Sequence, residues 1–125
     1  MITDSKKKNI VSLAASTLCG DKVRNPQGEH IGEIKEIMID TYNGKVSYAV
    51  LSFGGFMGLG EKLFAIPWQA LSLDKEKHEF VLSVSKETLQ KAKGFDKSDW
   101  PDFADSKFNN EEIYNQYGYQ PYWNL

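Results

Sequence analysis

The chain has 125 residues, of which 41% are hydrophobic and 26% charged, and its formal net charge is −2 at neutral pH. This length suits one domain with a single modest core, and the composition is that of a soluble globular protein rather than a disordered or fibrous one. The slight negative charge gives no broad attraction to nucleic acid. No stretch approaches the roughly 18 apolar residues that a membrane-spanning helix needs.

Few residues could ligate a metal. Cys19 is the only cysteine, which excludes an intrachain disulfide and a cysteine-based zinc site. The two histidines, His30 and His78, lie far apart in polar segments that we expect to be surface turns. We therefore predict no metal and no cofactor.

The N-terminal segment allows two interpretations. Three consecutive lysines precede a weakly apolar run that reaches Cys19, which is the outline of a secretion signal. Against this, Thr17 and Leu18 stand where a lipoprotein cleavage site has small residues, and three hydroxyl residues dilute the run. We expect a solvated leader over residues 1–15 and a cytoplasmic protein. The alternative is export through residues 1–19.

The first two predicted elements are strands. Residues 21–25 form a short strand that ends at a turn containing proline and glycine. Residues 29–40 form a longer strand, because four isoleucines favour a pleated surface and a hairpin signal follows. The apolar positions slip in phase between Ile34 and Ile37. We therefore predict a β-bulge near residues 35–36, which would suit the strong coiling of a small barrel.

A hairpin turn and a glycine-rich loop follow. Residues 41–44 contain Asn-Gly, which supplies the positive φ that hairpin turns prefer. The strand over 45–53 is apolar on both sides in its second half, so we expect one face in the core and the other under a loop or partner. Residues 54–62 form a tight glycine loop, and the strand over 63–68 is stopped by Pro67.

The central part of the chain closes with a hairpin and a helix. Residues 70–73 and 79–84 are predicted to pair across a charged turn. Ser85 is the expected N-cap of a short helix, and Gly94 is placed as its C′ residue. Six short strands with tight turns predict a small antiparallel barrel or sandwich.

The C-terminal segment is aromatic and acidic. Nine of the sixteen aromatic residues lie in the last thirty-one positions, interleaved with aspartates and glutamates. Residues 109–117 have the outline of one more short helix, ended by Gly118. Because each ring offers a large apolar area, we expect this tail either to wrap its own barrel or to dock on a second subunit.

No motif supports catalysis or nucleotide binding. The glycine loop lacks the spacing of a P-loop or a dinucleotide fingerprint, and Glu61 would oppose a phosphate. The serines have no histidine or cysteine arranged as a catalytic partner, so we predict that the chain is not an enzyme. The aromatic tail could stack nucleic-acid bases, but its neighbours are acidic rather than basic, so we predict no nucleic-acid partner.

Several short motifs occur together along the chain. They are Leu18-x-Gly20-Asp21-x-Val23, Pro26-x-Gly28-x-x-Ile31-Gly32-x-Ile34, Ile39-Asp40, Gly44-x-Val46, Phe53-Gly54-Gly55-Phe56-x-Gly58-Leu59-Gly60-x-Lys62 and Phe64-x-Ile66-Pro67-Trp68. Each motif is weak alone, but their combined spacing resembles the PRC-barrel domain. This family is named after the cytoplasmic domain of the photosynthetic reaction-centre H subunit. The tail also looks like that of stand-alone bacterial members.

The resemblance implies a mainly β fold, a small, strongly bent antiparallel barrel of about six strands. It covers residues 16–92 and leaves residues 93–125 as a C-terminal extension with short helices. It also implies an adaptor or docking module with no enzymatic activity. We expect neither the transmembrane helix of the reaction-centre subunit nor the second domain of the ribosome-maturation factor RimM, so we carry over no functional residue from either.

We therefore expect a non-enzymatic protein-interaction module that forms a homodimer or binds another protein. The alternative is a small-ligand-binding or catalytic barrel whose mouth is the glycine loop 54–62. The candidate interaction surface combines apolar residues of that loop with aromatic residues of the tail. It consists of Phe56, Met57, Leu59, Trp100, Phe103, Tyr119, Tyr122 and Trp123.

Overall fold

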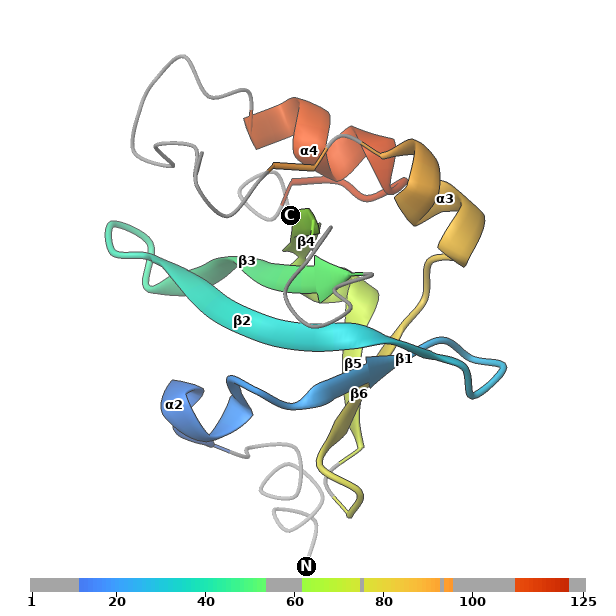
Figure 1. Cartoon of the computed structure of the whole chain (residues 1–125). Coiled ribbons are helices and arrows are strands. Elements are labelled where there is room, and N and C mark those ends of the chain that lie inside the picture. Colours follow the sequence, from blue (N-terminus) through green and yellow to red (C-terminus); the bar gives the residue numbers. More distant parts are fainter. Residues whose placement is uncertain (1–11, 54–61, 75, 93, 96–109, 122–125) are drawn as a thin grey trace, which may run out of the picture.

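A six-stranded sheet organises the fold (Figure 1). The computed structural model describes residues 12–53, 62–74, 76–92, 94–95 and 110–121. The strands are β1 (Lys22–Arg24), β2 (His30–Asp40), β3 (Lys45–Phe53), β4 (Lys62–Pro67), β5 (Leu71–Asp74) and β6 (Glu79–Leu82). The helices are α2 (Ala15–Leu18), the 3-10 turn η1 (Trp68–Ala70), α3 (Lys86–Lys91) and α4 (Asn110–Gln116).

The sheet is a curled half-barrel, which confirms the predicted fold class. Its strand order is β4-β3-β2-β1-β6-β5. The pairings are antiparallel except that of β1 with β6, which is parallel and differs from the antiparallel sheet that we predicted. The physical reason is η1. Through η1, β4 continues into β5 without the reversal of direction that a hairpin would give. The turn between β5 and β6 then reverses the chain, so β6 runs in the same direction as β1.

The predicted bulge in β2 is confirmed. The register between β2 and β3 shifts between Ile34 and Glu36, at the point where the apolar phase slips. The shift keeps Ile34 and Ile37 on the face that holds the main core. Met38 then points to the opposite face, where it packs against Tyr48. The two faces of β2 and β3 therefore belong to two separate apolar clusters.

The hairpin turn between β2 and β3 is built differently from the predicted one. Gly44 has a φ of 68°, as expected, but His78 is the only non-glycine with positive φ in the described part of the chain, so Asn43 does not share this conformation. The turn has four residues and is organised by Asp40. Its carboxylate accepts the backbone N–H groups of Tyr42 and Asn43, each at 2.9 Å.

The predicted start of α3 is confirmed and its predicted end is wrong. The Ser85 side chain accepts the N–H of Thr88 at 3.1 Å, as an N-cap does. The helix ends at Ala92 in an extended conformation, so Gly94 is not its C′ residue. Glycine is required at position 94 for a different reason, because the neighbouring strand leaves no room for a Cβ atom. A Cβ there would lie 2.7 Å from the carbonyl oxygen of Leu63, on the adjacent edge strand.

The main core fills the inner face of the curl. Its members are Val23, Ile31, Ile34, Ala49, Leu51, Phe64, Ile66, Ala70, Phe80, Leu82, Val84, Leu89 and Tyr117. As predicted, Phe80, Leu82 and Val84 share one face.

Helix α4 covers the opposite, outer face of β3 and β4 (Figure 1). Tyr114 is fully buried there, with its ring centroid 5.3 Å from that of Tyr48. Its hydroxyl donates to the backbone carbonyl of Ser47. We call this cluster, which consists of Met38, Tyr48, Ala65, Ile113, Tyr114 and Tyr119, the closed face. Residues 110–121 therefore pack on the chain's own sheet.

Candidate docking groove

An apolar groove lies at the open end of the inner face. It encloses about 830 Å³ between α2, the far half of β2, η1 and the β5–β6 hairpin. We call it the inner groove. Its lining is Ser12, Leu13, Ala15, Leu18, Ile37, Ile39, Gly44, Val46, Trp68, Leu73 and Phe80. No lining residue carries a charge, and nine of the eleven are apolar. A surface of this kind recognises apolar groups rather than ions.

The unequal lengths of β1 and β2 explain why the groove is open. Strand β2 runs from His30 to Asp40, but β1 pairs with it only between His30 and Glu33. The Gly20 N–H donates to the Ile34 carbonyl, and the Ile34 N–H donates to the Asp21 carbonyl. These two hydrogen bonds extend the pairing as far as Ile34. Beyond that point the inner face of β2 projects past β1 and β6. The apolar side chains on this projecting part are consequently left at the surface.

The side chains of the groove differ in exposure. Ile39 is 52% exposed and Leu13 is 48% exposed. Deeper in the groove, the ring of Trp68 meets that of Phe80 edge to face, with centroids 5.9 Å apart. The groove therefore has a fixed aromatic wall and an aliphatic rim that water reaches.

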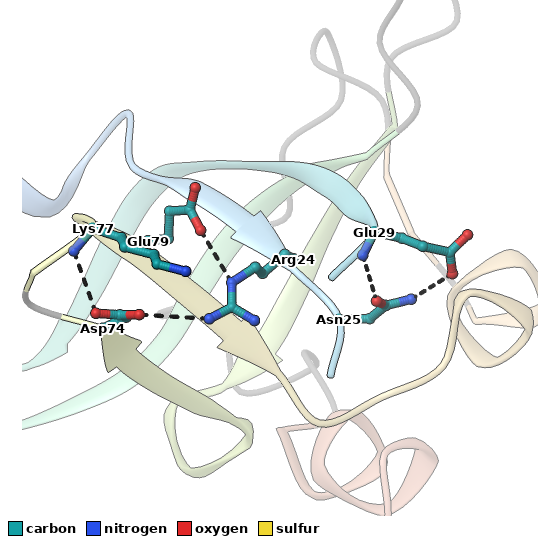
Figure 2. A network of polar contacts seen from close by, with 6 residues as sticks. All are labelled: Arg24, Asn25, Glu29, Asp74, Lys77 and Glu79. Carbon is teal, nitrogen blue, oxygen red and sulfur yellow. Dashed lines mark hydrogen bonds and ion pairs between the residues drawn. The ribbon is translucent and has the colours of Figure 1, made fainter. Parts of the chain in front are cut away.

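A polar cluster stands apart from the groove, where β1 meets β5 and β6 (Figure 2). The Arg24 guanidinium contacts Glu79 at 3.0 Å and Asp74 at 3.5 Å. Asp74 also accepts the backbone N–H of Lys77 at 3.3 Å. Because one cation meets two carboxylates, this cluster has no surplus positive charge for an anionic ligand. Its role is to tie β1 to the β5–β6 hairpin.

The second half of the same network fixes the turn after β1 (Figure 2). Asn25 is 3% exposed and exchanges two hydrogen bonds with Glu29, both at 2.8 Å. A shallow depression of about 410 Å³ nearby is lined by Lys22, Arg24, Gly28, His30, Lys77 and Glu79. Across β1 and β2, Lys22 lies directly opposite Glu33. The mixed charges again favour a structural role.

The described residues include one free cysteine, Cys19, which is half-buried. Burial raises the pKa of the Cys19 thiol, and the nearby carboxylates of Glu36 and Asp21 raise it further. A thiol with a raised pKa stays protonated at neutral pH and is a poor nucleophile. Within the described ranges, no group of three or more histidine, cysteine, aspartate and glutamate side chains is placed to hold a metal ion.

One residue of the predicted interaction surface can be located. Tyr119 is half-buried, packs against both apolar clusters, and donates its backbone N–H to the carbonyl of Tyr114 at 3.0 Å. The other seven residues lie outside the described ranges, as does the glycine loop except for Lys62. The predicted surface and the predicted ligand mouth therefore stay predictions.

The sequence interpretation did not identify the inner groove. Its lining comes from several segments that are far apart along the chain, so no single motif marks it. One signal was present. After the bulge, Ile37 and Ile39 lie on the inner face of β2, in the part of the strand that β1 is too short to reach.

Comparisons with known proteins agree with this architecture. The family model of the PRC-barrel domain matches residues 11–89, which is more than half of the chain. The chain belongs to the PRC-barrel family. No curated protein matches it. PRC-barrel domains mediate protein interactions.

One solved structure to which the chain is similar is described as a putative 16S ribosomal RNA processing protein RimM from Pseudomonas aeruginosa. It is 19% identical, with a TM-score of 0.44, and the match covers 65% of this chain and 49% of that one. The chain thus spans about half the length of that RimM protein. In the part of the chain that the structure describes, no helix is long and apolar enough to cross a membrane.

Proposed function

We propose that the chain is a non-enzymatic protein-interaction module that self-associates through the inner groove. The observation that carries this proposal is an uncharged groove with a half-exposed aliphatic rim, Leu13 and Ile39, on a sheet whose other side is covered by α4 at β3 and β4. Covering apolar surface contributes about 25 cal/mol per Å². A partner with an apolar contact surface therefore gains free energy at this site.

The described part of the aromatic tail, residues 110–121, does not motivate this proposal. Tyr114 and Tyr117 are buried against the chain's own sheet, and the outer side of β3 lies under α4. These apolar groups are used within one chain and are not available to a second copy. The support for self-association therefore comes from the opposite side of the sheet.

Sedimentation velocity over a range of protein concentrations tests the proposal. We expect the wild-type chain to form a dimer whose fraction rises with concentration. Ile39→Glu places a charge in the apolar lining and should weaken association at least tenfold. Gln90→Glu is the matched control, because it adds the same charge at an exposed position on α3 and should leave association unchanged. A wild-type chain that stays monomeric throughout would disprove self-association.

The size of the groove favours one second candidate, a small apolar ligand. Ligand pockets typically have volumes of roughly 300–1,000 Å³, and the groove has about 830 Å³. A thermal-shift assay with lauric acid as the probe separates the two functions. Stabilisation that Ile39→Glu abolishes, in a chain that is monomeric, would favour the ligand. A dimer that shows no thermal shift would favour the interaction module.

A further inference from the structure

The tip of the β2–β3 hairpin presents an exposed aromatic side chain. Tyr42 is 95% exposed, whereas the other exposed large hydrophobic residues of the described chain are near one half. Tyrosine is enriched among the residues that dominate protein interfaces, because it buries a large apolar ring and keeps a polar end. Such an exposed ring at a projecting turn is a candidate anchor.

The tip is held in one shape. The Asp40 carboxylate accepts the N–H groups of Tyr42 and Asn43, and its second oxygen accepts the Asn43 side-chain amide at 2.8 Å. The backbone N–H of Gly44 donates to the Asp40 carbonyl, also at 2.8 Å. Because these bonds fix the loop before any partner arrives, little backbone entropy remains to be lost on binding.

The inner groove lies at the base of the same hairpin. Ile39, Gly44 and Val46 line it, and they are two to four residues from Tyr42 in the sequence. Tyr42 does not fill this groove, since its side chain is almost fully exposed. Each molecule therefore carries a projecting aromatic ring and an uncharged apolar groove side by side.

This juxtaposition suits a two-fold symmetric pair. In such a pair each chain uses the same patch, so the tyrosine of one chain meets the groove of the other, and the reverse contact forms at the same time. Because ring and groove are adjacent, both contacts lie near the symmetry axis within one compact interface.

The charges on the hairpin permit this approach. At its base, Asp40 lies directly across from Lys45. Across the tip, residues 40–45, this one acid and this one base cancel, so the hairpin tips of two copies carry no net charge that would make them repel each other. The opposed acid and base of two hairpins that meet around a two-fold axis are also complementary. The groove lining itself is uncharged.

We propose that a second copy of this chain occupies the inner groove and that Tyr42 is the side chain it inserts. The inference rests on the proposed self-association and specifies its geometry. Two substitutions separate the two halves of the contact. Tyr42→Ser removes the ring and leaves the groove intact, and Ile39→Glu charges the groove and leaves the ring intact.

Native mass spectrometry of the full chains tests this pairing, because the two variants differ in mass. We expect each variant alone to dimerise at least tenfold more weakly than the wild type. An equimolar mixture should form heterodimers, since the ring of the Ile39→Glu chain fits the groove of the Tyr42→Ser chain. The heterodimer should be weaker than the wild-type dimer, because it keeps one of the two contacts.

Thr41→Ala is the matched control at the hairpin tip, next to Tyr42, and should dimerise like the wild type. Circular dichroism melting curves verify that each variant is folded. A monomeric wild type would overturn the proposed function and this inference together. A wild-type dimer that Ile39→Glu breaks and Tyr42→Ser leaves intact would overturn only the role of Tyr42. Two weakened variants that do not recover on mixing would overturn the ring-in-groove pairing.

Discussion

The closed face and the inner groove lie on opposite sides of the sheet, and both include residues of β2 and β3. On the closed face, α4 places Tyr114 against Tyr48 and excludes water from β3 and β4. On the other side, β2 extends past its short neighbour and leaves Ile39 half-exposed. Within the described ranges, the chain therefore covers one apolar surface with its own helix and leaves another open. We infer that the uncovered surface is the one that serves a partner.

The largest expected effect is on the closed face. Tyr114→Ala removes a fully buried ring, and we expect it to lower the free energy of unfolding by about 3–5 kcal/mol. Urea denaturation measures this change. Tyr114→Phe is the control, because it keeps the ring and loses only the hydrogen bond to Ser47, at about 1 kcal/mol. A small effect of the alanine variant would show that α4 does not stabilise the sheet.

A smaller effect is expected where the chain passes the edge of β4 between α3 and α4. Leu63 and Phe95 exchange two backbone hydrogen bonds there, at 2.9 and 2.8 Å. In Gly94→Ala the added Cβ would meet the Leu63 carbonyl oxygen at 2.7 Å and the Phe64 ring at 2.8 Å. We expect a loss of about 1–3 kcal/mol in urea denaturation. Gln90→Ala, at an exposed helical position, should change little, and equal stability of both variants would contradict the close approach.

The Tyr117 hydroxyl gives a pH-dependent test of how deeply this residue of the C-terminal segment is buried. Burial raises the pKa of Tyr117, and its hydroxyl has no hydrogen-bond partner within the described residues. The unfolded chain then releases this proton at a lower pH than the folded chain does. Stability is full below about pH 10, the ordinary tyrosine pKa, and falls as the pH rises above it.

Tyr117→Phe should remove this contribution to the alkaline loss of stability. At neutral pH the variant should equal the wild type or exceed it by up to about 1 kcal/mol, because a buried hydroxyl without a partner costs desolvation energy. Denaturant titrations between neutral and alkaline pH measure both effects. Tyr42→Phe, compared at concentrations at which the chain is monomeric, is the control at an exposed ring. An unchanged alkaline slope in Tyr117→Phe would place the hydroxyl in contact with water.

The smallest effect on folding is expected in the groove. Ile39→Ser should change the free energy of unfolding by no more than about 0.5 kcal/mol, because the side chain is half-exposed. Ile34→Ala, on the same face of the same strand but 1% exposed, should cost about 2–5 kcal/mol. Denaturation of the monomeric proteins at low concentration compares them. Similar losses in both variants would mean that the groove is part of the folding core.

Local sequence signals predicted much of the fold. The bulge in β2 follows from the spacing of four isoleucines, and the start of α3 follows from Ser85, because both depend on residues that are close in the chain. Interactions between distant residues were not accessible in the same way. The parallel pairing of β1 with β6 depends on how η1 redirects the chain, and the role of Gly94 depends on the approach of Leu63.

The candidate site was harder to predict, for the same reason. The tail offered a dense aromatic pattern, and the structure places Tyr114 and Tyr117 against the chain's own sheet. The groove offered no dense pattern, because its lining is assembled from segments between Ser12 and Phe80. Ile39 lies at the surface because β1 is too short to cover it. This difference in length between β1 and β2 has a consequence only once the two strands are paired.

The parallel pairing of β1 with β6 also sets an order of events in time. Strands β1 to β4 are joined to their neighbours by short connections, and β5 pairs with β6 across one turn, so each group can form early from local contacts. Joining the two groups brings together Arg24 and Glu79, which are 55 residues apart. Closing a loop of that length costs more entropy than closing a hairpin. During synthesis, we therefore expect the edge of β1 that pairs with β6 to stay unpaired until β6 has left the ribosome. The curled sheet is complete only after that step.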